Sequence, residues 1–292
     1  INDSTFYDCK SLENVYLSAN LREICCSAFD KCESLKSIEI PNTVEKIHDN
    51  AFRKCKSLLE VIVPESVNFM GENVFRHCSS LRKVVIEASI SYIPAFSFKN
   101  CESLTEIVIP NSVTIIKNNS FFNCTALEEI VIPDSVSIIE YFAFCNCSSL
   151  KKFDIPNSVE FLDTAVLMDC SSLKEVYLPP SITNIGDSFF NDCKSLIKVT
   201  IPDSVTEICC NAFKGCCSLI EINIPPSVKK IGYGAFMNCS SLKEIMIPSS
   251  VMEMGDDLFS KCSSLEKVVI NSESVQIYSE MFSECSSLNE IR

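Results

Sequence analysis

The sequence predicts a β-rich repeat solenoid of about 13 coils of 23 residues each. Two observations carry this prediction. The chain has a strict 23-residue period, and each period contains a short alternation of apolar and polar residues that usually ends at proline. A unit of 23 residues cannot bury an apolar side alone, so successive coils must stack on one another. We expect an arc whose parallel strands line the inner, concave side.

A column of cysteines makes the period visible. Cys recurs at every 23rd residue from Cys9 to Cys285, thirteen times without exception. Leu lies three residues after each of these cysteines, and Phe lies three residues before each, except at Leu167. Thirteen frames of one length leave no room for a linker, so we predict a single repeat domain over residues 1–292.

Residues 44–64, VEKIHDNAFRKCKSLLEVIVP, show the elements expected in one coil. The apolar spacing around Val61 and Val63 ends in a period of two, which predicts a short strand. Pro64 cannot donate to a strand ladder and therefore ends it. The stretch from Val44 to Ile47 is a second candidate strand because it is β-branched. The AFRKC segment between them leaves too few residues for a helix and predicts a tight turn or one 3₁₀ turn.

Composition and charge exclude several classes of function. The net charge of −13 opposes binding to a nucleic-acid backbone or to anionic lipid. There is no run of about 18 apolar residues, so direct membrane insertion is not expected. The chain has two histidines, no glycine-rich phosphate loop and no nucleophile with a base in reach. We therefore expect neither an enzyme nor a bound cofactor.

The 19 cysteines fall into two groups. The thirteen in the column are expected to be buried, because a buried Cys behaves as a small hydrophobic residue. The other six lie outside the column, at Cys25, Cys26, Cys145, Cys209, Cys210 and Cys217. Coils eight repeats apart cannot share one metal ion, so we expect no metal site. Whether any of the six forms a disulfide is left open by the sequence.

The candidate binding surface lies on the Leu-x-x-Ile-x-Ile strands. Residues five and seven positions after each column Cys should face solvent, since side chains alternate along a strand. Position five interleaves Glu and Lys, which predicts a self-neutralising ladder. Position seven places apolar residues on four consecutive coils, the apolar stripe Ile62, Val85, Val108 and Val131, with Leu59 beside it. Tyr177 and Met246 form a predicted secondary patch. An exposed apolar stripe often marks an interaction site, although β-branched residues also simply suit a sheet.

The repeat consensus resembles a known family. Residues 224–248, IPPSVKKIGYGAFMNCSSLKEIMIP, are similar to the leucine-rich repeat of BspA-type surface proteins, the Treponema pallidum type. The resemblance covers the whole chain and implies a right-handed leucine-rich repeat solenoid. It also implies adhesin-like recognition of host or neighbouring-cell proteins, on a cell surface or after secretion.

Two functions are therefore expected, and both are protein binding without catalysis. The first is a surface or secreted recognition module that takes a protein or peptide ligand. The second is an intracellular, cytoplasmic scaffold, which the many free thiols favour because such thiols suit a reducing compartment. Neither end of the chain carries the polar cap that a solenoid needs, so we expect a fragment of a longer array or self-association through its ends.

Overall fold

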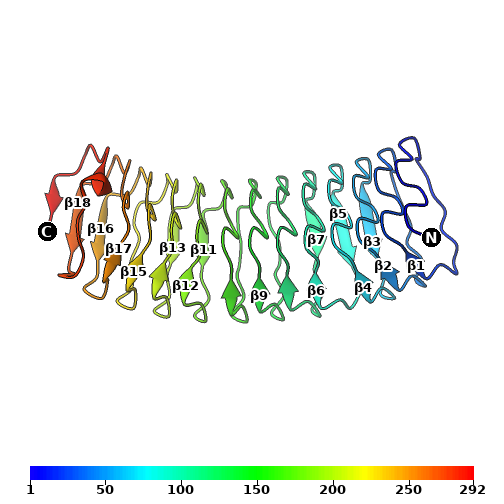
Figure 1. Ribbon diagram of the computed structural model, residues 1–292, viewed down its shortest axis with the longest axis horizontal. Coiled ribbons are helices and arrows are strands. Elements are labelled where there is room, and N and C mark those ends of the chain that lie inside the picture. The colour runs from blue at the N-terminus through cyan, green and yellow to red at the C-terminus, as the bar shows by residue number, and fades with distance from the viewer. The chain divides into compact units, whose positions relative to one another are not determined.

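The computed structural model describes residues 1–292, except for the side chain of Ser279. The chain forms two compact units, residues 1–150 and 151–292. Both units are built from the same 23-residue coil, which passes through a short strand, a turn and a second short strand (Figure 1). The predicted fold class is confirmed: this is a parallel-strand β-solenoid with almost no helix.

The first strand of each coil corresponds to the predicted Val-x-x-Ile stretch and is two residues long. In residues 1–150 these strands are β1 (Glu23–Ile24), β2 (Lys46–Ile47), β4 (Phe69–Met70), β6 (Tyr92–Ile93), β8 (Ile115–Ile116) and β9 (Ile138–Ile139). In residues 151–292 they are β10 (Phe161–Leu162), β12 (Asn184–Ile185), β14 (Glu207–Ile208), β15 (Lys230–Ile231) and β17 (Glu253–Met254). The strands pair in parallel between residues 23 positions apart, as in Ile24 with Ile47. The sequence period is therefore also the hydrogen-bonding register.

The second strand of each coil is the Leu-x-x-Ile-x-Ile segment. In residues 1–150 these strands are β3 (Glu60–Val63), β5 (Lys83–Ile86) and β7 (Glu106–Val108). In residues 151–292 they are β11 (Glu175–Tyr177), β13 (Lys198–Thr200), β16 (Glu244–Ile247), β18 (Lys267–Ile270) and β19 (Glu290–Ile291). They form the parallel sheets β3-β5-β7, β11-β13 and β16-β18-β19. One 3₁₀ helix, η1 (Ser279–Phe282), completes the assigned elements.

A turn joins the two strands of each coil, as the AFxxC stretch predicted. In the coil of β2 it spans residues 49–54 and contains two residues with left-handed backbone, Asn50 (φ 58°) and Lys54 (φ 62°). Almost every coil repeats this pair of positive φ values. Asn, Asp and Gly occupy many of these positions, because they adopt that conformation most readily.

The core of each unit contains a column of stacked phenylalanine rings. Neighbouring rings lie 5.1–5.9 Å apart and nearly parallel, as in Phe75–Phe98 and Phe98–Phe121. Such offset pairs add to the burial of a large apolar side chain. Leu167, which interrupts the Phe pattern in the sequence, is also fully buried.

Eleven of the 13 column cysteines, from Cys32 to Cys262, fill the core beside the Phe rings. The expectation of burial is wrong for the first and last coils, where Cys9 is exposed and Cys285 is half-buried because only one neighbouring coil covers each.

Buried thiols of the column also make hydrogen bonds. The Sγ of Cys101 donates to the carbonyl oxygen of Phe75 in the preceding coil at 3.2 Å, and Cys239 donates to Phe213 O at 3.1 Å. The sequence analysis treated these residues as small hydrophobic groups. The structure adds that such a thiol satisfies a buried backbone acceptor, which a bare Ala side chain would not do.

The 19 cysteines, all in the described part of the chain, form no disulfide, which makes thiol labelling a direct test of the fold. A small thiol reagent added to the native, reduced chain is expected to reach at most the seven cysteines that are exposed or half-buried: Cys9, Cys25, Cys26, Cys209, Cys210, Cys217 and Cys285. After unfolding in denaturant, all 19 are expected to react. Mass spectrometry of the labelled peptides provides the count, and rapid labelling of the buried column in the native state would contradict the packing.

Candidate ligand-binding surface

The predicted apolar stripe lies on the outward face of strands β3, β5 and β7. The parallel register places Ile62 opposite Val85 and Val85 opposite Val108. Ile62 is 54% exposed and Val108 48% exposed, while Val85 between them is half-buried. Three apolar side chains from consecutive coils therefore form one continuous surface. Their orientation is the one predicted from strand alternation.

The other two predicted residues extend this surface less regularly. Val131 is 80% exposed, but it lies in residues 127–133, which form no strand. Leu59 is exposed just before β3. The registered part of the apolar stripe is thus Ile62, Val85 and Val108, with Leu59 and Val131 as exposed apolar neighbours in the same unit.

Part of the apolar stripe lines a hollow of about 560 Å³. The stripe residues that line it are Ile62 and Val85. The rest of its lining is a mixture of charged, polar and apolar residues. These are Ser37, Ile38, Glu39, Ile40, Asn42, Glu60, Val61, Pro64, Lys83 and Glu87. A concave apolar floor with a few charged groups at its rim is the usual form of a ligand site. This hollow is the candidate binding site of residues 1–150.

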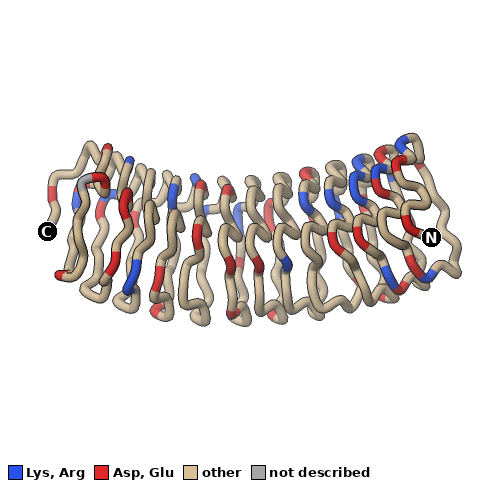
Figure 2. Tube along the Cα trace, viewed as in Figure 1, with Lys and Arg blue, Asp and Glu red and all other residues tan. Residues whose placement is uncertain are grey.

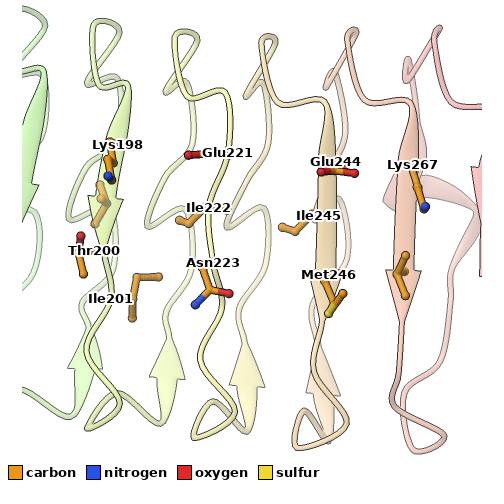
Figure 3. Close-up of a pocket in the computed structure, with 12 residues that line it drawn as sticks. Lys198, Thr200, Ile201, Glu221, Ile222, Asn223, Glu244, Ile245, Met246 and Lys267 are labelled. Atoms are coloured by element: carbon orange, nitrogen blue, oxygen red, sulfur yellow. The ribbon is translucent and has the colours of Figure 1, made fainter.

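A second hollow lies on the same face of the strands in residues 151–292. It has a volume of about 440 Å³ and includes Met246, which is 58% exposed. Figure 3 shows Thr200, Asn223 and Met246 along its floor, with Lys198, Glu221, Glu244 and Lys267 beside them. Thr200 and Asn223 stand here at the frame position where the apolar stripe has Val and Ile.

Tyr177 does not line the second hollow. It is 61% exposed and lies opposite Thr200 in the β11–β13 pair, so Thr200 and Asn223 separate it from Met246. The two residues of the predicted secondary patch are therefore both exposed, but they are three coils apart. They do not form one continuous patch.

Charged residues form the predicted ladder beside these hollows. Lys83 Nζ lies 2.7 Å from Glu106 Oε1, and Lys267 Nζ lies 3.8 Å from Glu290 Oε2. Figure 2 shows acidic and basic segments interspersed in both units. Because these pairs are half-buried to exposed and lie at the surface, each contributes only about 0–1 kcal/mol to stability. Their main effect is to set the local charge that a ligand would meet.

Two further exposed apolar residues, at the frame position of Leu59, were not predicted from the sequence. Ile197 and Ile220 occupy the same frame position as Leu59 on two consecutive coils, and both are exposed. The signal was available in the repeat, since each lies four residues after a column cysteine. They give residues 151–292 an apolar edge beside the second hollow.

A basic cluster on the turn side of residues 1–150 was also missed. Arg53 makes two hydrogen bonds to the buried carboxylate of Asp30, at 2.7 and 3.1 Å. In the next coil, burial and the positive charges of Arg76 and Lys54 lower the pKa of His77. His77 is therefore held neutral at physiological pH, and the cluster lies away from the strand face.

One group of potential metal ligands lies outside both hollows. The side chains of Glu23, Cys25 and His48 meet at the ends of β1 and β2. Glu23 Oε2 lies 3.1 Å from His48 Nε2. This group was not predicted, because the two histidines were judged too few for a zinc site and no metal site was expected from the sequence.

Comparison with known proteins identifies the repeat. A family model described as "BspA type Leucine rich repeat region (6 copies)" matches residues 1–108, 91–219 and 206–292, which together cover the chain. The chain belongs to the BspA-type leucine-rich repeat family. Members of this family and fold are typically not enzymes. No curated protein matches the chain closely enough to count as a relative.

Solved structures agree with this assignment. This BspA-type chain is 30% identical to a leucine-rich repeat protein from Bacteroides ovatus, with a TM-score of 0.88 over 99% of this chain and 74% of that one. It is 27% identical to a leucine rich cell surface protein from Faecalibacterium prausnitzii, with a TM-score of 0.62 over 95% of this chain and 85% of that one. A leucine-rich repeat protein from Eubacterium ventriosum, 18% identical with a TM-score of 0.58 over 91% of this chain and 84% of that one, shares the fold.

Proposed function

We propose that this BspA-type chain binds a protein or peptide ligand through the apolar stripe of residues 1–150. The observation that carries the proposal is the registered row of Ile62, Val85 and Val108, which a hollow of about 560 Å³ partly covers. Contiguous exposed apolar surface is costly in water and is typical of interaction sites. A ligand would bury this floor by apolar contact, while Glu60 and Lys83 at the rim would orient its charges.

We further propose adhesin-like recognition of host or neighbouring-cell proteins, at a cell surface or after secretion. Support comes from the relative in Faecalibacterium prausnitzii, which is described as a cell surface protein and has the same fold. The one helix assigned among the described residues, η1, has four residues and is far too short to cross a bilayer.

The test compares two double variants with the parent chain. Val85→Glu with Val108→Glu places two charges on the apolar stripe, and Thr200→Glu with Asn223→Glu places the same charges at equivalent positions of the second hollow. Each chain is first checked for its fold by circular dichroism and then tested for binding to immobilised extracellular-matrix proteins. We expect the first variant to bind at least about 10-fold more weakly than the parent, since each tenfold corresponds to about 1.4 kcal/mol. The second variant is expected to bind like the parent.

Equal binding by all three folded chains would show that the apolar stripe is not a binding site. Its Val and Ile residues would then be there because β-branched residues suit a β-sheet. Loss of binding in the second variant alone would move the site to the hollow around Met246. Binding by none of the three would reject extracellular-matrix proteins as the ligand class.

A second function is favoured by the 19 free cysteines. Free thiols in this number suit a reducing interior, where the chain would serve as an intracellular scaffold for protein partners. Protease treatment of intact cells distinguishes the two functions. Digestion of the chain supports the surface proposal, and protection of the chain until the cells are lysed supports the scaffold.

A further inference from the structure

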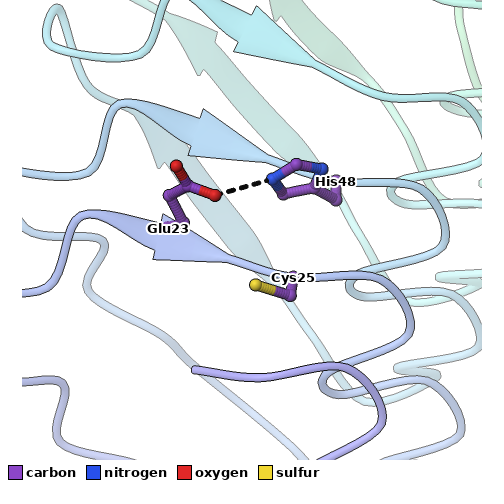
Figure 4. A group of neighbouring side chains, drawn as sticks. All are labelled: Glu23, Cys25 and His48. Carbon is purple, nitrogen blue, oxygen red and sulfur yellow. Dashed lines mark hydrogen bonds and ion pairs between the residues drawn. The ribbon is translucent and has the colours of Figure 1, made fainter.

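Three side chains of different chemistry meet at the ends of β1 and β2. Glu23 lies on β1, Cys25 follows β1 directly, and His48 follows β2 directly. One ligand atom from each, a carboxylate oxygen, the sulfur and an imidazole nitrogen, lies within 4.8 Å of the other two. Figure 4 shows the Glu23 carboxylate and the His48 ring joined by a hydrogen bond, with the Cys25 sulfur beside them.

The register of the two strands explains why these residues meet. Ile24 lies opposite Ile47, so the residues that follow, Cys25 and His48, are neighbours in adjacent coils. The amide of His48 donates to the carbonyl of Ile24 at 2.9 Å and fixes this arrangement. Ile24 is buried, and strand alternation therefore directs Glu23 and Cys25 to the opposite, outer side.

We propose that Glu23, Cys25 and His48 bind a zinc ion between the first two coils with strands, leaving a fourth position for water. Thiolate, imidazole and carboxylate are the ligands that zinc prefers, at about 2.0–2.3 Å from the metal. Two tetrahedral ligands at such distances are about 3.3–3.7 Å apart. The observed Oε2–Nε2 distance of 3.1 Å is close to this separation. The Cys25 sulfur, within 4.8 Å of the other two ligand atoms, would move inward on binding. On binding, Cys25 loses its thiol proton to solvent.

The surroundings leave the ligand atoms available. Lys46 Nζ pairs with the other carboxylate oxygen of Glu23, Oε1, at 3.1 Å, so Oε2 can turn to the metal while this ion pair persists. The His48 ring packs against Phe69 with centroids 5.5 Å apart, which restricts its orientation. The next residue in the His48 column is Gly71, which adds no side chain that could cover the site.

The local charge also favours a cation. Cys26, next to Cys25, lies near the carboxylates of Asp3 and Asp49, and its amide donates to Asp3 Oδ1 at 2.9 Å. The negative charge of these carboxylates attracts a divalent ion to the adjacent ligands.

A similar group of residues without the histidine lies eight coils further along the chain and serves as an internal control. Glu207, Cys209 and Lys230 repeat Glu23, Cys25 and Lys46, including an ion pair of 3.3 Å between Lys230 and Glu207. The position of His48 is taken by Gly232. A Cβ at Gly232 would lie 2.6 Å from the backbone nitrogen of Cys210, so no side chain fits there without a backbone shift. This second group lacks the imidazole and should not bind zinc.

The experiment titrates Co²⁺ into the full chain, reduced and free of oxygen, and then displaces it with Zn²⁺. We expect one ion per chain, with a thiolate-to-cobalt absorption band that zinc abolishes. His48→Gln and Cys25→Ser are expected to bind cobalt at least about 100-fold more weakly, because each removes a direct ligand. His77→Gln and Cys209→Ser remove the other histidine and the equivalent cysteine, and both are expected to bind like the parent.

A second measurement on the parent chain does not depend on variants that fold. In nuclear magnetic resonance spectra, zinc is expected to shift the imidazole signals of His48 and leave those of His77 in place. Absence of a cobalt–thiolate band, equal affinity in all four variants, or equal shifts of both histidines would each overturn the proposal.

Discussion

Raising the pH above about 9 is expected to unfold this chain, because its buried thiols can ionise only after unfolding. Burial raises the pKa of nine fully buried thiols above the usual value of 9.0, for example to about 11 at Cys32 and about 12 at Cys262. The others are Cys55, Cys78, Cys101, Cys124, Cys147, Cys216 and Cys239. At each of them desolvation of the thiolate is the main cause.

The sign of the effect follows from proton binding. Since the folded pKa lies above the unfolded pKa, the folded chain holds more protons as the pH rises past 9, and its stability falls. Below pH 9 both states are protonated, and the full stability is present. At pH 10 each such thiol costs on the order of 1 kcal/mol, so nine cost on the order of 10 kcal/mol. This is comparable to the whole free energy of unfolding of a typical domain, about 5–15 kcal/mol.

Far-UV circular dichroism of the reduced chain between about pH 7 and 11 provides the measurement, with return to pH 7 as the control for reversibility. We expect a cooperative loss of β structure above pH 9 that is largely recovered on return. Retention of the native spectrum at pH 11, or a transition centred well below pH 9, would show that the cysteine column does not control alkaline stability.

Replacing one stacked ring is expected to have the largest effect of any single core substitution. Phe98 is fully buried and stacks on Phe75 at 5.7 Å and on Phe121 at 5.4 Å. Phe98→Ala removes both contacts and leaves a cavity that neighbouring coils cannot close, because the backbone ladders fix their spacing. The expected loss of unfolding free energy is about 3–5 kcal/mol, measured by urea denaturation.

Phe161→Ala is the matched control. Phe161 lies on β10 with about half of its side chain exposed, so its loss should cost much less than that of Phe98. Similar destabilisation by both substitutions would contradict the assignment of the Phe column as the main core. A fall in the denaturation slope without a shift of its midpoint would instead indicate that the two units unfold separately.

The binding surface shows where sequence reasoning succeeds and where it stops. Exposure of Ile62 and Val108 could be predicted, because strand alternation is a local rule and the repeat places every residue in a known frame. The separation of Tyr177 from Met246 could also have been read from the frame, since they stand three coils apart. The loss of strand structure around Val131 could not be predicted, because residues 127–133 have the same repeat sequence pattern as the corresponding residues of adjacent coils.

The repeat alone was enough to predict the coil, the two strand columns, the turn and the Phe, Cys and Leu columns of the core. Each of these depends on local spacing, and stacking of equal coils converts that spacing directly into burial and register. The same period places Cys25 and His48, 23 residues apart, next to each other in adjacent coils. The contact of Glu23 with His48 is different, because it depends on side-chain conformation in three dimensions, which the repeat period does not encode.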